Sequence, residues 1–339
     1  MKKYIFFFLS ILFLVSCKSK LKIVENTNPS LKKRVFWKNP PNLKKGDTIL
    51  LLTPASYLKD SIHSISTALD SLKSWGLNYK IGKHIFDKHG HFAGLDSDRS
   101  LDFQNAIDNP NIKAIWCTRG GYGSVRMIDG INFTKLQQNP KWVIGYSDVT
   151  AIHNEIHNVG VQSLHAVMPV NFKKPSQDKN EAISTFKKTL FGEKLKYTIE
   201  GNSYNKIGKT KGVLVGGNLT LLHTMLGSTS TIDMSNKILF IEDVGEKKYR
   251  VDRMLQSLKR AGYFEKCKGV IVGSFTEAKA QNPPFAKSFE ALILDALEAY
   301  DFPILFNFPA GHQTDNRALV FGSAIEMNVK KDSSTVDFN

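Results

Sequence analysis

Short apolar runs rich in β-branched residues alternate along this chain with segments whose apolar residues recur at helical spacing. The runs that predict buried strands are 49–52, 112–117, 142–145, 212–218, 238–241, 269–273 and 304–306. The helical stripes that follow four of them are 62–72, 149–159, 219–226 and 251–258. Strands that alternate with helices predict a parallel sheet with helices on both faces, and such sheets bind ligands at the carboxyl ends of their strands.

Two polar stretches divide the chain. Residues 18–44 are basic and contain three prolines, which predicts a linker. Residues 173–205 are rich in Lys, Asn, Ser and Gln and have weak apolar periodicity apart from 183–190, so we expect an inter-domain linker there. The prediction is an N-terminal domain over 45–172 and a C-terminal domain over 206–335, and 339 residues are enough for about two domains.

The N-terminus has the pattern of a bacterial lipoprotein signal. Two lysines precede an apolar run, 4–15, that is too short to span a bilayer comfortably. Ser16 and Cys17 follow and resemble a lipobox, in which the cysteine is lipidated and becomes the first residue of the mature protein. We therefore expect a signal peptide over 1–17 and a chain that is exported, anchored to a membrane through Cys17, and facing the periplasm. A plain secretory signal is the alternative.

Positive charge is concentrated behind this signal. The formal net charge is +15, and nine basic residues but one acid lie between Lys18 and Lys45. This segment is predicted to be a basic tether. The rest of the chain has no zinc spacing and no nucleic-acid-binding motif, so we expect no nucleic-acid partner. Cys117 and Cys267 lie in apolar runs and are predicted to be buried free thiols.

Ser147 lies where the strand over 142–145 gives way to the helix that starts at Val149. This position holds a hydroxyl at the carboxyl end of a strand, close to the free backbone N–H groups of a helix start. Those groups can stabilise an oxyanion, which a nucleophilic serine needs. The alternative is that Ser147 or Asp148 simply caps the helix. The sequence here is Gly-x-Ser-Asp, and it differs from the Gly-x-Ser-x-Gly elbow of α/β-hydrolases.

A glycine-dense turn, 119–123, follows the strand over 112–117. One interpretation is a loop whose backbone comes close to a ligand and offers N–H donors. The other is an ordinary turn between a strand and a helix. It is not a phosphate-binding P-loop, because no Gly-Lys-Ser/Thr follows.

An acid and a histidine also follow predicted strands. Glu242 and Asp243 come after 238–241, and His312 lies in a Pro/Gly-rich turn after 304–306. Taken singly, the acids could match the dipole of the next helix, and the histidine could be structural. Together with Ser147, however, they provide a nucleophile, a base and an acid to orient the base.

These segments together resemble the serine LD-carboxypeptidases, or muramoyltetrapeptide carboxypeptidases, a family that includes the microcin C self-immunity proteins. The resemblance covers about residues 44–330. The segments that carry it are Gly46-Asp47-Thr48, Thr53-Pro54-Ala55-Ser56, Arg119 to Gly123, Gly145-Tyr146-Ser147-Asp148, Gly216-Gly217-Asn218-Leu219, Glu242-Asp243-Val244 with Tyr249 and Asp252-Arg253, and Gly311-His312.

The resemblance implies a triad of Ser147, His312 and Glu242. It implies an oxyanion hole made by the N–H of Asp148 and an N–H of Gly120 or Gly121. The implied fold is α/β, with a flavodoxin-like, doubly wound N-terminal domain and a smaller mixed α/β C-terminal domain. A homodimer is implied, and neither a metal nor another cofactor.

We further predict that Arg119, Tyr122 and Asn218 bind substrate. Two departures from the family pattern affect the rim of the site. Ala166-Val167 replaces the Gly-Pro that is common after His165, and Val320-Phe321-Gly322 stands where a Pro-x-Gly turn is common.

The predicted activity is removal of the terminal D-alanine from murein tetrapeptides by a Ser-His-Glu mechanism. One alternative is hydrolysis of a peptidyl-nucleotide antibiotic of the microcin C type. The other is a lipoprotein that binds muropeptides without turning them over.

The lipid anchor is testable at Cys17. A Cys17→Ala chain is expected to lose stable membrane association, because a basic segment alone binds an anionic surface weakly and in a salt-sensitive way. Wild type and variant are fractionated in high salt. Equal retention of both in the membrane fraction would contradict the lipoprotein assignment.

Overall fold

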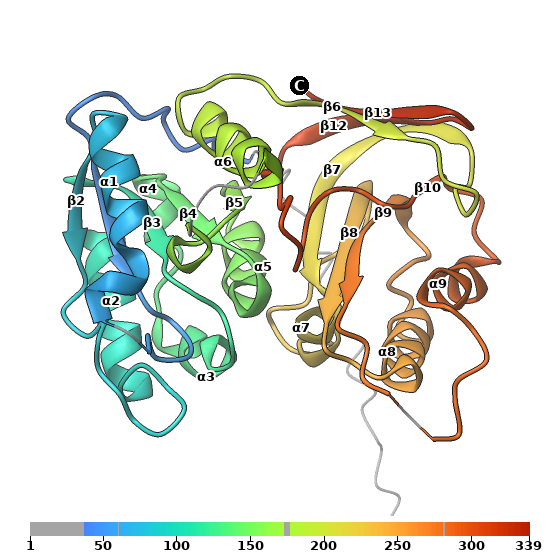
Figure 1. The fold of residues 1–339 in the computed structure, drawn as a ribbon, viewed down its shortest axis with the longest axis horizontal. Coiled ribbons are helices and arrows are strands. Elements are labelled where there is room, and N and C mark those ends of the chain that lie inside the picture. The colour runs from blue at the N-terminus through green and yellow to red at the C-terminus, as the bar shows by residue number, and fades with distance from the viewer. Residues whose placement is uncertain (1–36, 60, 173–176, 281) are drawn as a thin grey trace, which may run out of the picture. The chain divides into compact units, whose positions relative to one another are not determined.

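The structure is a computed structural model that describes residues 37–339 except 60, 173–176 and 281. The predicted signal peptide, Cys17 and most of the 18–44 linker lie outside the described residues. The described residues form one compact unit by their contacts. Its chain builds two β-sheets with helices packed against both (Figure 1). The first comes from the N-terminal half plus one strand of the C-terminal half, and the second comes from the C-terminal half alone. No helix among the described residues is long and apolar enough to cross a membrane.

The first sheet is parallel except at one edge, in the order β11-β5-β4-β3-β1-β2. Its strands are β1 Thr48–Leu52, β2 Asn78–Ile81, β3 Ile112–Cys117, β4 Trp142–Gly145, β5 Ser163–His165 and β11 Leu319–Phe321. The order of the first five strands is 2-1-3-4-5, the flavodoxin-like order. Its helices are α1 Ser66–Ser74, α2 Asp96–Asp108, α3 Ser124–Met127, α4 Lys135–Gln138 and α5 Thr150–Asn158. The predicted doubly wound N-terminal fold is therefore confirmed.

The second sheet is mixed, in the order β10-β9-β8-β7-β12-β13-β6. The parallel strands are β7 Gly208–Asn218, β8 Lys237–Val244, β9 Cys267–Thr276 and β10 Ile304–Leu305. The antiparallel strands are β6 Lys196–Glu200, β12 Ala324–Val329 and β13 Ser333–Phe338. The helices of this half are α7 Leu219–Thr224, α8 Lys248–Arg260 and α9 Phe289–Leu297. The mixed α/β class predicted for this half is confirmed.

The stretch 173–205 contains regular structure that its polar composition conceals. Helix α6, Gln177–Leu190, buries Ala182, Phe186 and Leu190, which lie four residues apart on one face. Strand β6 buries Tyr197 and Ile199, which alternate with exposed residues. Lysines on the solvent side of both elements dilute these patterns in the sequence.

Segments from outside the predicted N-terminal domain contribute to the fold around it. Strand β11 comes from the C-terminal half, yet Leu319 pairs with His165 at the edge of the first sheet. Leu43, within the predicted N-terminal linker, is buried, and its N–H donates to Leu190 O at the end of α6. The chain between the signal and the first domain is therefore part of the fold at least from residue 37 onward.

Helix α5 is fixed to the first sheet by a buried histidine. His153 Nε2 donates to Gly145 O (2.9 Å), and its Nδ1 lies 2.8 Å from Ser163 Oγ. Burial lowers the pKa of His153 to about 4, so its imidazole is neutral at physiological pH. The contact holds the start of α5, and the turn before it, against the last residue of β4 and the first residue of β5.

Candidate active site

Ser147 lies in a strained turn between β4 and α5. Its φ is +64°, a left-handed conformation that costs a non-glycine residue energy and persists only when its surroundings enforce it. A single 3₁₀ turn, Ser147–Val149, leads into α5, which has no side-chain cap. Asp148 Oδ2 instead accepts the N–H of Ser124 at the start of α3 (2.7 Å). Capping of α5, the alternative role for Ser147 and Asp148, is therefore not what this turn does.

A chain of hydrogen bonds links the two halves at this turn. His312 Nε2 lies 2.9 Å from Ser147 Oγ, and His312 Nδ1 lies 2.6 Å from Glu242 Oε2. Glu242 is fully buried within β8 and lies six residues before α8 begins. Its carboxylate is therefore not placed at the start of the next helix. The geometry is that of a hydroxyl, an imidazole and an orienting carboxylate.

Glycines allow these close approaches. A methyl group on Gly311 would lie 2.8 Å from Glu242 Cβ and 2.6 Å from Ser274 Oγ, so only a glycine lets this turn press His312 against Glu242. A methyl on Gly217, at the end of β7, would lie 2.4 Å from Thr150 Oγ1. That contact brings the carboxyl ends of the second sheet against the start of α5.

The two neighbouring acids have separate roles. Asp243 accepts hydrogen bonds from the backbone N–H of Thr220 (3.0 Å) and from Asn218 Nδ2 (3.1 Å) at the start of α7. Burial, with repulsion from Glu242, raises the pKa of Asp243 to about 6. The structure therefore directs Glu242 to His312 and uses Asp243 to support α7.

The electrostatics of His312 favour its cation. Burial by itself lowers the pKa of His312, but the charge of Glu242, the hydrogen bond to it, and the charges of Asp243 and Glu277 outweigh burial. The net result is a pKa above the usual histidine value. An imidazole that readily takes a proton from a hydroxyl is what a general base requires.

Comparisons with known proteins agree with this geometry. Residues 49–166 match the sequence model of the LD-carboxypeptidase N-terminal domain, and residues 211–327 match that of the LD-carboxypeptidase C-terminal domain. This chain belongs to the LD-carboxypeptidase family.

Relatives and solved structures extend the match over most of the chain. A probable murein peptide carboxypeptidase of Bacillus subtilis is 34% identical, covering 88% of this chain and 94% of that protein. A murein tetrapeptide carboxypeptidase of Pseudomonas aeruginosa is 29% identical, covering 81% and 91%. The crystal structure of muramoyltetrapeptide carboxypeptidase from Oxalobacter formigenes has a TM-score of 0.77 at 28% identity, covering 86% and 98%. The microcin C7 self-immunity protein MccF shares the fold, with a TM-score of 0.79 at 21% identity and coverage of 89% and 98%. The chain is thus a carboxypeptidase by family.

The glycine turn of this LD-carboxypeptidase lies directly behind Ser147. A methyl on Gly120 would lie 2.9 Å from Ser147 Cβ and 3.3 Å from the backbone N of Asp148. Gly121 faces the other way, since a methyl there would lie 2.1 Å from Ser56 Oγ. Of the two glycines predicted for the oxyanion hole, Gly120 is therefore the one whose Cα faces the serine.

The three predicted substrate-binding residues lie in different surroundings. Arg119 is half-buried and lines the pocket that contains Ser147 and His312. Tyr122 is 49% exposed and packs on Phe92, with ring centroids 5.8 Å apart. Asn218 is buried, and its Oδ1 accepts the N–H of Leu221, so it caps α7. Asn218 therefore supports α7, whereas the placement of Arg119 suits a ligand contact; substrate binding by the three residues stays a prediction.

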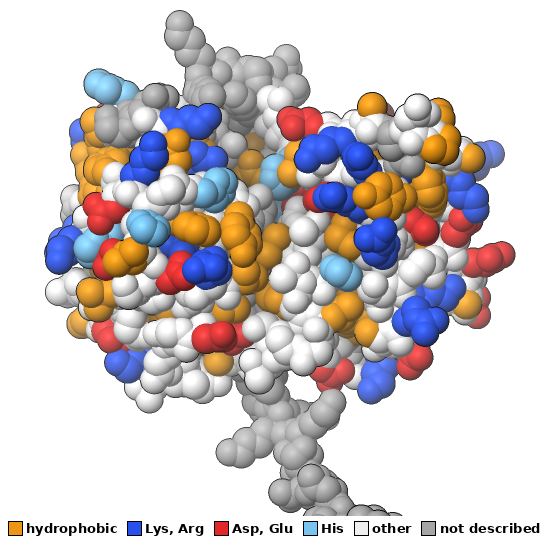
Figure 2. Space-filling view, turned by 90° about the horizontal axis from the view of Figure 1, so that it is seen from below, with side chains coloured by type: hydrophobic (Ala, Val, Ile, Leu, Met, Phe, Trp, Pro, Cys, Tyr) orange, Lys and Arg blue, Asp and Glu red, His pale blue; other side chains and the backbone are white. Residues whose placement is uncertain are grey.

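The site opens into two adjoining recesses. One has a volume of about 580 Å³ and is lined by Ser147, Arg119 and Gly120; the other, of about 400 Å³, is lined by Glu277 and Gln313. Both recesses share the residues Tyr146, Val170, Asn171 and His312. Figure 2 shows the molecule from below, where basic and histidine side chains lie on both sides of the seam between the halves.

Two supporting residues escaped the sequence analysis. The ring of Tyr146 packs edge-on against His312, with centroids 5.0 Å apart, and Asn316 Oδ1 accepts the N–H of Gly311 (2.9 Å). Tyr146 stands within the Gly-Tyr-Ser-Asp segment and could have been suspected from it. No sequence pattern points to Asn316, because its role depends on how the turn after β10 folds back.

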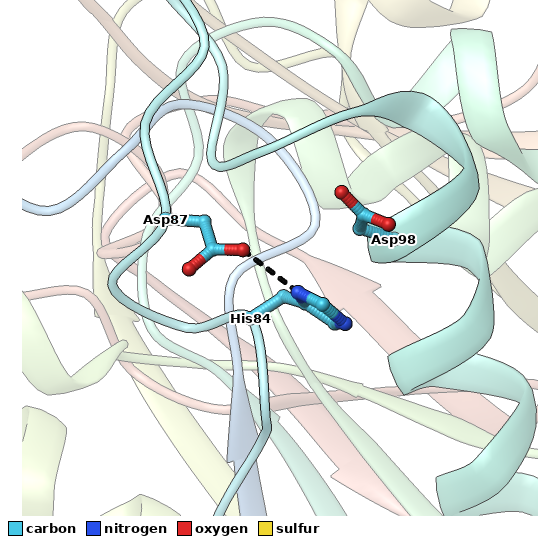
Figure 3. A group of neighbouring side chains, drawn as sticks. All are labelled: His84, Asp87 and Asp98. Carbon is cyan, nitrogen blue, oxygen red and sulfur yellow. Dashed lines mark hydrogen bonds and ion pairs between the residues drawn. The ribbon is translucent and has the colours of Figure 1, made fainter.

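Among the described residues, one group of side chains could hold a metal ion: His84, Asp87 and Asp98 (Figure 3). His84 Nδ1 lies 2.7 Å from Asp87 Oδ2, and Asp98 Oδ2 accepts the N–H of Leu95 (3.2 Å). The two loop residues follow β2, and Asp98 lies in the first turn of α2. None of the three lines either recess.

The pH profile follows from the raised pKa of His312. The base must be neutral to accept a proton, so kcat/KM is expected to fall as pH drops through a value above about 6.5, the ordinary histidine pKa. Glu242→Gln removes the charge that raises this pKa. The acidic limb should therefore move to lower pH, and the plateau should fall by roughly 10³-fold or more. An unmoved limb in Glu242→Gln would mean that another group controls it.

Proposed function

We propose that this LD-carboxypeptidase hydrolyses murein tetrapeptides, releasing the terminal D-alanine by a serine mechanism. The observation that carries the proposal is the hydrogen-bond chain from Ser147 through His312 to Glu242, at 2.9 and 2.6 Å. The names of relatives in Bacillus subtilis and Pseudomonas aeruginosa support the murein peptide as substrate class.

In the acylation step, Ser147 Oγ attacks the carbonyl carbon of the scissile amide while His312 Nε2 takes the hydroxyl proton. Glu242 holds the imidazole through Nδ1 and stabilises the imidazolium. In this proposal, the N–H groups of Asp148 and Gly120 receive the negative charge that develops on the carbonyl oxygen. His312 then passes its proton to the amide nitrogen, the C–N bond breaks, and the D-amino acid leaves as an amine.

In the deacylation step, water takes the place of the departed amine. His312 removes a proton from this water as it attacks the acyl carbon. The ester bond to Ser147 Oγ breaks and the proton returns to the serine. The products are a shortened stem peptide with a new carboxylate and the free amino acid.

Arg119 suits recognition of the free carboxylate that defines a carboxypeptidase substrate. It is half-buried, one guanidinium N–H donates to Tyr57 O (3.0 Å), and no Asp or Glu of the described chain forms an ion pair with it. The described lining of its recess includes Lys59 and His63 but no acid. Since guanidinium groups bind carboxylates with paired hydrogen bonds, this recess favours the end of a peptide chain.

The two alternatives have less support. The microcin C7 self-immunity proteins match at 21–22% identity, which shows a shared fold and does not select their ligands. A protein that only binds muropeptides has no need for a serine held at positive φ beside a histidine and a buried acid. Export, the Cys17 anchor and a homodimer stay predictions from the sequence.

The triad is tested by single substitutions. Ser147→Ala and His312→Ala are each expected to lower turnover of a purified tetrapeptide muropeptide by roughly a thousandfold or more, because triad members act as a unit. Release of free D-alanine is measured, and circular dichroism confirms the fold. Near-normal hydrolysis by folded Ser147→Ala would refute the serine mechanism.

Arg119 is tested by comparing two peptides. Arg119→Gln is expected to raise KM for the tetrapeptide by about tenfold or more, because a charge-assisted hydrogen bond to the carboxylate is lost. It should hardly change the slow cleavage of the same peptide with an amidated C-terminus. Lys88→Gln is the control, since Lys88 is an exposed cation that lines neither recess. Equal effects of Arg119→Gln on both peptides would assign Arg119 another role.

A further inference from the structure

The turn 119–123 has few side chains with which to hold its own shape. Three of its five residues are glycines, and Gly121 and Gly123 have φ values of +111° and +141°. Glycine loses more conformational freedom on folding than any other residue. An oxyanion donor helps catalysis only if it is fixed before the reaction. The turn therefore needs support from neighbouring segments.

Ser56 supplies two such supports from the segment after β1. It is 3% exposed, its backbone N–H donates to Gly120 O (3.4 Å), and its Oγ accepts the N–H of Tyr122 (3.2 Å). Arg99, buried in α2, adds a third support by donating to Gly123 O (2.9 Å). The turn is thus held from one side by Ser56 and Arg99, while Gly120 contacts Ser147 on the other.

His91 holds the hydroxyl of Ser56. Its Nε2 lies 2.6 Å from Ser56 Oγ. A hydroxyl has one donor and two acceptor sites, and Tyr122 uses one acceptor. The hydroxyl proton is thereby free to be donated to an unprotonated Nε2. The imidazole ring also packs edge-on against Phe92, with centroids 5.7 Å apart.

We propose that Ser56 and His91 are positioning residues for the oxyanion hole. Their hydrogen bond orients the Ser56 hydroxyl, the hydroxyl fixes Tyr122 N–H, and the turn then presents Gly120 beside the N–H of Asp148. The inference rests on the proposed function, because the position of this turn matters only if Ser147 attacks a carbonyl or an equivalent electrophile. Neither Ser56 nor His91 lines the recess that contains Ser147, so they act through the turn and not on the substrate.

The test compares Ser56→Ala, His91→Phe and His91→Gln. Two rates are measured: labelling of Ser147 by a small fluorophosphonate, and hydrolysis of tetrapeptide muropeptide with kcat and KM determined separately. Ser56→Ala and His91→Phe are expected to lower the labelling rate and kcat by about 10- to 100-fold, because a small misplacement near the reacting atoms costs that much. KM should stay within about twofold. His91→Gln, whose amide oxygen can still accept the Ser56 proton, should recover most of the loss.

His89→Ala is the matched control on the same loop, and it should behave as wild type. His91 is exposed, so its variants are expected to fold even if Ser56→Ala does not. In that case the two His91 variants alone test the proposed positioning role. Wild-type labelling and kcat in folded His91→Phe would overturn the proposal, as would equal losses in His91→Phe and His91→Gln. If wild type is labelled but does not cleave the tetrapeptide, the substrate assignment fails while the labelling rates still judge this inference. If Ser147 of the wild type is not labelled, the serine mechanism fails and this inference fails with it.

Discussion

The site depends on one buried interaction, the hydrogen bond between His312 Nδ1 and Glu242 Oε2. Glu242 is fully buried, and a buried carboxylate is costly unless it is paired. Its other oxygen has no hydrogen-bond partner among the described residues, so the imidazole is its main compensation. This need keeps the turn of His312 pressed against β8 and holds the imidazole in the orientation that points Nε2 at Ser147.

Close packing of backbone makes that pairing possible. A side chain at any of three glycines would overlap a neighbouring residue. At Gly311 it would overlap Glu242 and Ser274, at Gly217 it would overlap Thr150, and at Gly120 it would overlap Ser147. The three contacts join the second sheet to the start of α5 and join the glycine turn to the serine. Ser147 itself is held at φ +64°, and the energy of this strained conformation is offset by the packed elements around it. The site is therefore built from rigid strand ends, and its loops are fixed by glycines and a few polar anchors.

Charge is divided unevenly around this centre. The acids Glu242, Asp243 and Glu277 surround His312 and favour its cation, whereas the recess beside Ser147 carries Arg119, Lys59 and His63. Such a distribution suits a reaction in which the base becomes a cation while a free carboxylate lies on the side of the leaving group. The His84, Asp87 and Asp98 group lies apart from both recesses and takes no part in this arrangement (Figure 3).

The sequence by itself determined the alternation of strands and helices, and hence the α/β class, because buried strands and amphipathic helices leave periodic apolar patterns. It also placed Ser147, Glu242 and His312 near strand ends, where parallel sheets gather functional groups. Their convergence depends on how two sheets pack. So do the pairing of His312 with Glu242 and not with Asp243, the position of Gly120 beside Ser147, and the capping of α7 by Asn218. The same holds for α6 and β6, whose buried faces are short and diluted by lysine, and for Ser56 and His91, which are 35 residues apart. These were decided only by the tertiary structure, because hydrogen bonds and steric contacts between distant segments leave no periodicity in the chain.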